Sequence, residues 1–474
     1  MTADTGIEIE QLRSCFAGRM LTDPQDMQPF LSDWRGQWHG KARAVIQPDS
    51  TADVAAVVRW CAARRVPVVP QGGNTGLTGG SVPDASGDAV LLSLARLRSV
   101  RAVDPVNNTT TVEAGVKLFE VQQAAAAADR LFPLSLAAEG SCTIGGNLAT
   151  NAGGTAVLRY GNARDLCLGL EVVTAAGEIW DGLRGLRKDN SGYDLKQLFI
   201  GSEGTLGVIT AAVMKLFPQP AGRAVAFAAL QSPEAGLKLL SDAQRAAGPS
   251  LTAFELIAAE ALELVLRHIP GTRRPFGAMH PWYALVEISS ASGQADAAER
   301  MNQSLLEGLG RGGVPDAVIA HTLEQGRSLW TLRETISEAQ SIHGGNIKHD
   351  VSVPISRIPT FIEETVAALA RHFPGCTPVI FGHAGDGNLH FNVAPPPGRS
   401  ASELTEAVNR LVHDLVIAHG GSISAEHGLG VLRRDAAEAY RSPIATDLLR
   451  TIKRALDPLN IMNPGKVLRL PSDP

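Results

Sequence analysis

The sequence predicts an α+β fold with two domains and a helical C-terminal tail. A β-α-β pattern begins at Ala44, and short β-like runs then alternate with glycine-rich turns as far as residue 217. From there to about residue 430, helical periodicity alternates with β-like runs, and the last segment is helical. With 474 residues, 44% of them hydrophobic and 19% charged, the chain is long and apolar enough to bury two or three cores.

The composition argues against several classes of protein. With 43 basic and 48 acidic residues the net charge is -5, which does not suit a nucleic-acid partner. No apolar run reaches the ~18 residues of a membrane span, and the start MTADTGIEIEQL does not resemble a secretory signal. The five cysteines contain no CxxC motif, which argues against a disulfide framework or a metal–sulfur site. We expect a cytoplasmic protein.

The first domain is predicted over 44–217. Its opening strand is AVIQP, and Asp49-Ser50-Thr51 caps a helix over about 52–65. PVVPQ at 67–71 is the next strand.

The other boundaries follow from composition. Residues 1–43 form an N-terminal segment, PQPAGR at 218–223 is a linker, and the second domain is predicted over 218–430. The tail, 431–474, contains a helix at 436–456.

Three glycine-rich loops in the first domain indicate a phosphate-bearing cofactor. They lie at 70–80, 139–154 and 201–207. Glycine-rich loops present backbone N–H groups without side-chain obstruction, which suits a pyrophosphate. One such loop could be a plain surface turn, but three in one domain favour a binding site. The run at 308–313 matches the dinucleotide fingerprint yet follows a helix, so it is predicted to be a helix C-terminus.

A histidine hairpin is the strongest local signal for a metal site. In 381–392, FGHAGDGNLHFN, Asp386-Gly387 is a favoured two-residue turn, and counting outward pairs His383 with His390. Directly opposed side chains have Cβ atoms ~4.5–5.5 Å apart, so both imidazoles could bind one ion. A longer loop would loosen this pairing and still keep them near.

Two histidines leave a metal ion under-coordinated, and SAEHG at 424–428 offers a third ligand. If this stretch is extended, Glu426 and His427 point to opposite sides. Glu426 would complete a His–His–carboxylate set with an open position, as in a catalytic zinc site, although iron(II) and manganese(II) also fit.

Cationic side chains in 327–353 suit a substrate carboxylate. On one helix, Arg333 and Ser337 are four residues apart and share a face. Lys348 then begins a strand eleven residues later. An arginine fork with a lysine binds a carboxylate well.

At the three glycine loops the sequence resembles the vanillyl-alcohol-oxidase-type FAD-binding domain. From about Trp34 to Leu468 it is similar to the D-2-hydroxyglutarate and D-lactate dehydrogenase branch of that flavoprotein family. The resemblance implies an FAD-binding domain at 44–217, an α/β substrate- and metal-binding domain at 218–430, and a tail that returns to the flavin.

The resemblance also implies how the flavin is held. Asn74 stands where some relatives attach FAD through a histidine, so non-covalent FAD is expected. The implied cofactor contacts are Gly72, Gly73, Asn74, Thr75, Gly76, Thr78, Glu139, Gly140, Ser141, Gly145, Asn147, Thr150, Asn151, Gly153, Glu203, Gly204, Ile209 and Asn463.

Site roles in the second domain follow from the same resemblance. It implies that a divalent metal, zinc being favoured, is bound by three ligands, and that one histidine is the catalytic base. The ligands would be His383, His390 and Glu426, and the base His427. The substrate carboxylate would be held by Arg333, Ser337 and Lys348, with Asn392 in the same pocket. Serine at 337, where threonine is also seen, keeps the hydroxyl.

The activity that this resemblance implies is oxidation of D-2-hydroxyglutarate to 2-oxoglutarate by hydride transfer to FAD, with D-malate as a secondary substrate. The preference for the dicarboxylate rests on the resemblance along the whole chain, which includes the Asp33-Trp34-Arg35-Gly36 segment. D-lactate or glycolate dehydrogenase is the nearest alternative, and a flavin-dependent alkyl transferase or a non-catalytic metal-binding module is more distant. Electrons would leave to an external acceptor, an electron-transfer flavoprotein or a quinone, and a homodimer is compatible with this assignment.

Overall fold

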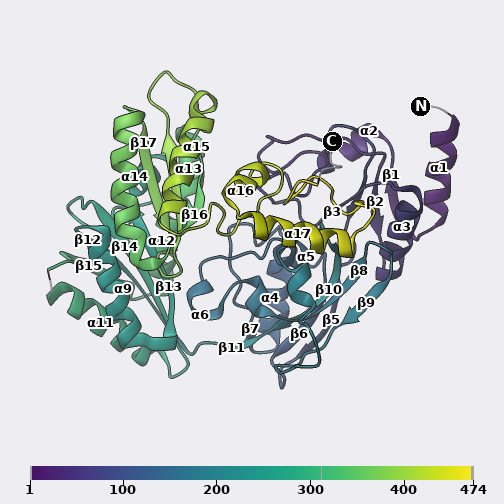
Figure 1. Cartoon of the computed structure of the whole chain (residues 1–474). Coiled ribbons are helices and arrows are strands. Elements are labelled where there is room, and N and C mark those ends of the chain that lie inside the picture. Colours follow the sequence, from purple (N-terminus) through teal and green to yellow (C-terminus); the bar gives the residue numbers. More distant parts are fainter. Residues whose placement is uncertain (1–2, 311, 471–474) are drawn as a thin grey trace. The chain divides into compact units, whose positions relative to one another are not determined.

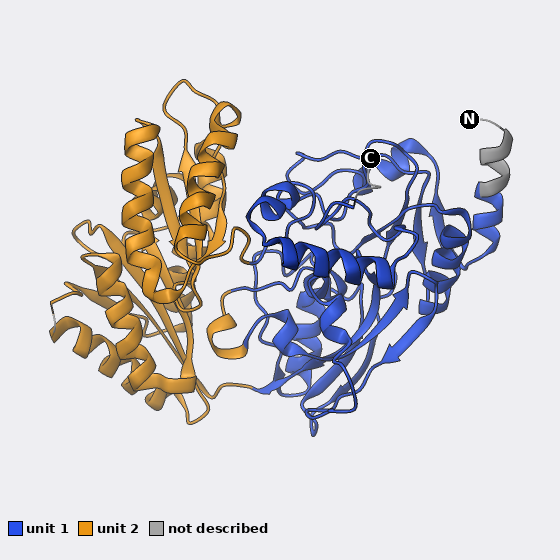
Figure 2. Cartoon of the chain, in the orientation of Figure 1, with its two compact units in different colours: residues 1–154, 161–218, 426–474 blue, residues 155–160, 219–425 orange. Residues whose placement is uncertain are grey.

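The computed structural model describes residues 3–310 and 312–470, and Figure 1 labels most of its helices and strands. Arg311 of the glycine run and the ends of the predicted terminal segments, 1–2 and 471–474, lie outside the described residues. The chain forms two compact units, shown in Figure 2. Unit 1 comprises 1–154, 161–218 and 426–474, and unit 2 comprises 155–160 and 219–425.

Unit 1 opens with the predicted β-α-β pattern. Ser50 caps α3 (Thr51–Arg64), because its Oγ accepts the N–H of Asp53 at 3.1 Å. The apolar face of this helix, including Val54 and Val57, is fully buried in the core of the unit. The surrounding four-stranded sheet has the order β1-β2-β4-β3, made of β1 (Gly18–Leu21), β2 (Ala44–Pro48), β4 (Val90–Ser93) and β3 (Val68–Gln71).

A second sheet of unit 1 carries the β-like runs of 100–215. Its neighbours are all antiparallel, and its central strand is almost wholly buried, as expected for an apolar run covered on both faces. The order β5-β6-β10-β8-β9 is made of β5 (Val100–Asp104), β6 (Thr109–Glu113), β10 (Gly207–Lys215), β8 (Cys167–Thr174) and β9 (Ile179–Gly182). A short pair joins β7 (Arg130–Leu131) to β11 (Phe217–Pro218).

The C-terminal segment returns to the first sheet of unit 1. Val68 of β3 donates its N–H to Ile461 O at 2.7 Å and accepts that of Asn463 at 2.8 Å. The remaining helices of unit 1 are α1 (Ala3–Ser14), α2 (Pro24–Met27), η1 (Gln28–Phe30), α4 (Leu118–Ala127), α5 (Ile144–Ala149), α7 (Ala163–Leu166), α8 (Lys196–Phe199), α16 (Arg434–Tyr440) and α17 (Pro443–Leu456).

Unit 2 is built on one seven-stranded antiparallel sheet with helices packed on it. The sheet has the order β15-β12-β14-β13-β17-β18-β16, made of β15 (Ala317–Ile319), β12 (Gly222–Leu230), β14 (Trp282–Ser290), β13 (Leu251–Ala258), β17 (Thr377–Gly382), β18 (Asn388–Ala394) and β16 (Asp350–Ser352). The helices of unit 2 are α6 (Val157–Tyr160), α9 (Pro233–Ala247), η2 (Gly248–Ser250), α10 (Ala259–His268), α11 (Gln294–Gly310), α12 (Leu323–Glu334), α13 (Ile336–His343), η3 (Ile355–Arg357), α14 (Ile358–His372) and α15 (Ala401–Ala418).

Three element predictions can be compared with the structure here. The glycine run at 308–313 does end a helix, since α11 stops at Gly310, so that prediction is confirmed. The prediction of a single helix over 436–456 is wrong. Ser442 caps a new helix that begins at Pro443, so the segment is divided into α16 and α17. The linker at 218–223 is shorter than predicted, because β12 begins at Gly222.

Candidate active site

The three glycine-rich loops of unit 1 line one cavity of ≈ 300 Å³. A volume of this order suits a small-molecule ligand. Of the residues predicted to contact the cofactor, those that line the cavity are Gly72, Gly73, Asn74, Thr75, Gly76, Thr78, Gly145, Asn147, Thr150, Gly153, Glu203, Gly204 and Ile209. Glu426 and His427 line it as well.

Five predicted cofactor residues do not line this cavity: Glu139, Gly140, Ser141, Asn151 and Asn463. Three of them form hydrogen bonds within unit 1. Glu139 Oε1 accepts the hydroxyl of Ser135 at 2.6 Å, and Asn151 Oδ1 accepts the N–H of Arg164 at 3.0 Å. Asn463 Nδ2 donates to Gly80 O at 2.9 Å and to Glu203 O at 2.7 Å, so it joins the first and third loops.

Glycine is required in these loops because one backbone packs directly on another. A Cβ on Gly73 would overlap the carbonyl oxygen of Ser141 in the second loop, and one on Gly145 would lie 2.6 Å from the Cβ of Ala114. The second loop also contributes Thr143, a residue that the sequence prediction did not single out. Its Oγ1 is buried and has no hydrogen-bond partner within the described part of the chain. A buried polar atom of this kind beside a cavity fits a ligand that carries polar groups, as FAD does.

Glu203 fixes the segment that follows His427 to the third loop. Its carboxylate accepts the N–H groups of Leu429 at 2.7 Å and Gly430 at 2.9 Å. Burial raises the pKa of Glu203, although these two N–H groups act in the opposite direction. Thr78 O accepts two further N–H groups of the same segment. The backbone just after His427 is therefore held by two of the glycine-rich loops.

The histidine hairpin has a different register from the predicted one. β17 and β18 pair Phe381 with His390, so His383 does not face His390, and that prediction is wrong. The turn spans 383–387 because His383 O accepts the N–H groups of both Asp386 and Gly387 at 3.1 Å. The longer-loop alternative holds instead: the two imidazole centroids lie 5.8 Å apart. Burial raises the pKa of Asp386 in this turn to about 6.

On the other side of β18, His390 pairs with Asp350 of β16, a residue that sequence reasoning missed. The main-chain oxygen of Asp350 accepts the N–H of Ala425 at 3.2 Å. Because Glu426 follows Ala425 in the chain, its Cα lies only ~3.8 Å farther along. Covalent connection thus brings Glu426 to the same end of β16.

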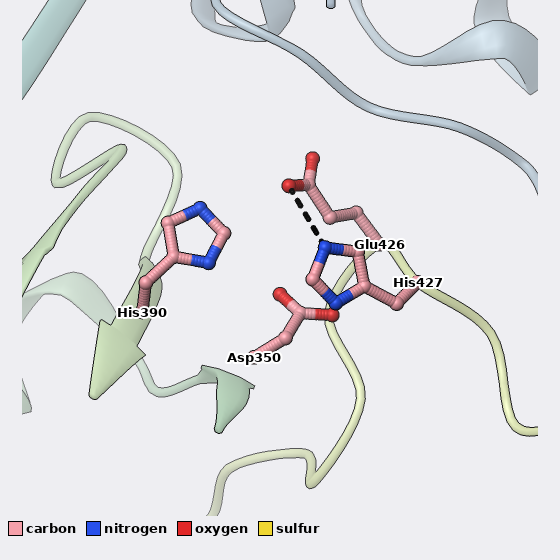
Figure 3. A group of neighbouring side chains, drawn as sticks. All are labelled: Asp350, His390, Glu426 and His427. Atoms are coloured by element: carbon pink, nitrogen blue, oxygen red, sulfur yellow. Dashed lines mark ion pairs between the residues drawn. The ribbon is translucent and has the colours of Figure 1, made fainter. Parts of the chain in front are cut away.

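Figure 3 shows the resulting group of Asp350, His390, Glu426 and His427, whose ligand atoms lie within 4.8 Å of one another. The expectation that Glu426 and His427 point to opposite sides is wrong, because the chain bends here. Glu426 Oε1 lies 3.9 Å from His427 Nε2. Two imidazoles and two carboxylates are donors that suit zinc, iron(II) or manganese(II). His383 is not a member of this group.

The four predicted substrate residues lie in different local settings. Arg333 and Ser337 do not share a helix face, because α12 ends at Glu334 and α13 begins at Ile336. Arg333 is 7% exposed, whereas Ser337 is an exposed residue. Lys348 is half-buried and precedes β16 by two residues, so it does not begin that strand.

Asn392 and Glu255 each form hydrogen bonds between different elements of unit 2. The amide of Asn392, 4% exposed, accepts the N–H of His349 at 3.2 Å and donates to Gln340 Oε1 at 2.9 Å. Glu255, also missed at the level of sequence, lies on β13 and accepts the Nε–H of Arg333 at 2.6 Å. Burial, the largest single influence, would raise the pKa of Glu255, but the charges and hydrogen bonds of Arg333 and His383 together outweigh it and hold that pKa at about 2.

Comparison with known families gives two matches along the chain. The family described as "FAD binding domain" matches residues 42–182. The family described as "FAD linked oxidases, C-terminal domain" matches residues 219–467. Solved structures with the same fold include 4-ethylphenol oxidase from Gulosibacter chungangensis, with a TM-score of 0.74 at 20% identity over 100% of this chain and 98% of that one. Alkyldihydroxyacetonephosphate synthase has a TM-score of 0.76 at 18% identity, over 98% and 85%. At such low identity these structures support the fold alone, and they confirm the predicted vanillyl-alcohol-oxidase-type architecture.

The chain belongs to the FAD-linked oxidase family and is an FAD-linked oxidoreductase. Within that family it groups with the D-2-hydroxyglutarate dehydrogenases. The relative of that name from Xanthomonas citri pv. viticola is 41% identical over 95% of this chain and 94% of its own length. The mitochondrial D-2-hydroxyglutarate dehydrogenase of Rattus norvegicus is 40% identical over 95% and 83%. Among the described residues, no helix has the length and apolar character that crossing a membrane requires.

Proposed function

We propose that this chain oxidises D-2-hydroxyglutarate to 2-oxoglutarate, using non-covalent FAD and a divalent metal ion, with zinc favoured. The observation that carries the proposal is the group of Asp350, His390, Glu426 and His427, which supplies nitrogen and oxygen ligands for one cation. Relatives that bear the name of this activity match 95% of the chain and support the choice of substrate.

Non-covalent attachment of FAD is supported by the contacts of Asn74. Its Nδ2 donates to Ser32 O at 2.8 Å, and its Oδ1 accepts the hydroxyl of Ser81 at 3.0 Å. The amide therefore holds the first loop in shape, and an amide is not a nucleophile that could bond to the flavin. FAD, when bound, supplies the hydride acceptor.

The metal ligands that we propose are His383, His390 and Glu426, with Asp350 as an adjacent carboxylate. The metal, when bound, acts as a Lewis acid that lowers the pKa of a substrate hydroxyl. His383 adjoins the group and is 7% exposed, while the carboxylates of Asp350 and Glu426 offset the charge of a divalent cation. A His–His–carboxylate set leaves a coordination position for the substrate.

Recognition and proton transfer fall to side chains of this chain. Arg333 and Lys348 would bind the C1 carboxylate by charge-assisted hydrogen bonds, with Ser337 and Asn392 completing the polar surroundings. His427 would accept the proton of the 2-hydroxyl, since an imidazole is the side chain that most often acts as a general base.

Two features of the proposal concern what lies beyond the reaction centre. D-malate, one methylene shorter, keeps both carboxylates and is the expected secondary substrate. Electrons are proposed to leave to an external acceptor, an electron-transfer flavoprotein or a quinone. The cytoplasmic location expected from the sequence stays a prediction.

The test is a comparison of kcat/KM for five acids with one dye acceptor. The acids are D-2-hydroxyglutarate, D-malate, D-lactate, glycolate and L-2-hydroxyglutarate. We expect the highest kcat/KM for D-2-hydroxyglutarate and the second highest for D-malate. If D-lactate or glycolate is preferred by tenfold or more, the dicarboxylate assignment is overturned. If the L-isomer is preferred, the stereochemical assignment is overturned as well.

A further inference from the structure

Glu255 is the one acidic residue of a strand that is buried along its whole length. All eight residues of β13, LTAFELIA, are buried, and Glu255 itself is 1% exposed. β13 pairs with β17 so that Leu256 faces Gly382. The pairing ends there, and the next residues of the two segments, Glu255 and His383, contact each other through their side chains. The position of the carboxylate thus follows from the end of this strand pairing within unit 2.

Both oxygens of Glu255 are used. Oε1 lies 2.6 Å from His383 Nδ1, and Oε2 accepts the Nε–H of Arg333 at 2.6 Å. A neutral imidazole carries one proton, and a carboxylate at this distance requires that proton to be on Nδ1. The lone pair is then on Nε2, the arrangement in which metal-binding histidines commonly occur.

Arg333 is oriented by the same carboxylate. Its guanidinium carbon lies 4.9 Å from the centre of the Phe381 ring, and its Nη2 is 3.5 Å from His383 Nε2. With Nε bound to Glu255, the plane of the guanidinium is set and its Nη edge is directed to the His383 side. One carboxylate therefore determines the spacing between a carboxylate-binding group and an imidazole.

That spacing has a chemical meaning for a 2-hydroxy acid. Its carboxylate and its hydroxyl are on adjacent carbon atoms, so the cation that binds the one and the metal that binds the other must be close neighbours. A 3-hydroxy acid separates the two groups by one more carbon.

We propose that Glu255 is a positioning residue that sets the tautomer of His383 and the distance from Arg333 to the metal, and thereby selects 2-hydroxy acids. This inference rests on the proposed function, since it takes His383 as a ligand and Arg333 as the carboxylate anchor. Glu255 would act through these two side chains. It also balances the charge of the buried Arg333, which would otherwise repel a cation bound at His383.

Three variants test the proposal. Glu255→Gln removes the charge and cannot accept from both partners, and Glu255→Asp keeps the charge with a shorter reach. Glu287→Gln is the matched control: Glu287 is a buried carboxylate on the adjacent β14, and its Oε2 accepts the indole N–H of Trp330 on α12 at 2.8 Å. It anchors the helix that bears Arg333 without contacting His383.

Zn²⁺ affinity is measured by competition with a chromophoric chelator on FAD-loaded, metal-stripped protein, and KM and kcat are measured separately. For Glu255→Gln we expect ~10–100-fold weaker Zn²⁺ binding together with a raised KM for D-2-hydroxyglutarate. Glu255→Asp should fall between it and the wild type. Glu287→Gln should bind Zn²⁺ within threefold of the wild type.

Two results would overturn the inference: unchanged Zn²⁺ affinity and KM in Glu255→Gln, or an equal loss in Glu287→Gln. Should Glu255→Gln fail to fold, Glu255→Asp is judged by the same criteria. Failure of the proposed function itself is distinguishable, because the wild type would then bind no Zn²⁺ or oxidise no 2-hydroxy acid.

Discussion

The cavity of unit 1 and the hairpin region of unit 2 are constructed from different parts of the peptide. The cavity is lined mostly by backbone and small side chains from the three glycine-rich loops. Around the hairpin, by contrast, the chemistry lies in side chains such as His390 and Asp350, which regular strand pairing brings together. In the cavity, substitutions that add atoms to glycine should impair binding. In the hairpin region, substitutions that remove functional side chains should impair activity.

The largest effect is expected from removing a metal ligand. His390→Ala should lower kcat by about 10³–10⁵-fold, since Lewis-acid stabilisation by a metal is worth several kcal/mol. Metal analysis should show loss of the ion, while the flavin spectrum shows FAD still bound in unit 1. Simultaneous loss of FAD would contradict the expectation that metal binding and FAD binding depend on different sets of residues.

His427 gives the next largest effect. His427→Gln should lower kcat by roughly 10²–10⁴-fold, the usual contribution of a general base, with metal content unchanged. Because its ligand atom lies within 4.8 Å of those of Asp350, His390 and Glu426, the alternative is that it binds the metal. Loss of metal from this variant would reassign it as a ligand.

The effect of Arg333 should appear in KM. Arg333→Met removes charge-assisted hydrogen bonds worth ~1.5–3 kcal/mol, so KM should rise by about 10–150-fold. Steady-state kinetics on D-2-hydroxyglutarate measure this, and a kcat loss at unchanged KM would show that Arg333 does not anchor the substrate.

The smallest effect concerns a single methyl group in unit 1. Gly73→Ala should weaken FAD binding by about tenfold, because its Cβ would overlap Ser141 O and the loop must move. Gly140→Ala is the control, since Gly140 does not line the cavity and a Cβ there has none of the described atoms within 4 Å. FAD affinity is measured by fluorescence titration of the apoprotein, and equal effects of the two substitutions would refute the role given to backbone packing.

The sequence predicted unit 1 better than the hairpin region for a physical reason. Loops that need glycine can be recognised from their composition. The strands and the Ser50 cap that precede them can be predicted from local sequence patterns. The hairpin register depended on the turn, where Gly382 at φ 154° and Gly387 at φ 90° allow a longer loop than the two-residue alternative. The count from Asp386-Gly387 could not detect this.

Contacts between residues that are distant in the sequence could not be predicted from local sequence patterns either. Glu255 is 128 residues from His383 in the chain, and only the pairing of β13 with β17 brings them together. A single glutamate within the apolar run AFELIA was the one available signal. Similarly, the end of α12 at Glu334 separates Arg333 from Ser337, and nothing in their four-residue spacing indicates a break.

Anaerobic mixing of the purified protein with substrate tests the central claim most directly. The account predicts that D-2-hydroxyglutarate bleaches the flavin absorbance of the metal-loaded protein within the turnover time, and that L-2-hydroxyglutarate does not. Metal-stripped protein should bleach at least ~10³-fold more slowly and recover when Zn²⁺ is added back. Equal bleaching with and without metal, or no bleaching by any D-2-hydroxy acid, would contradict the account.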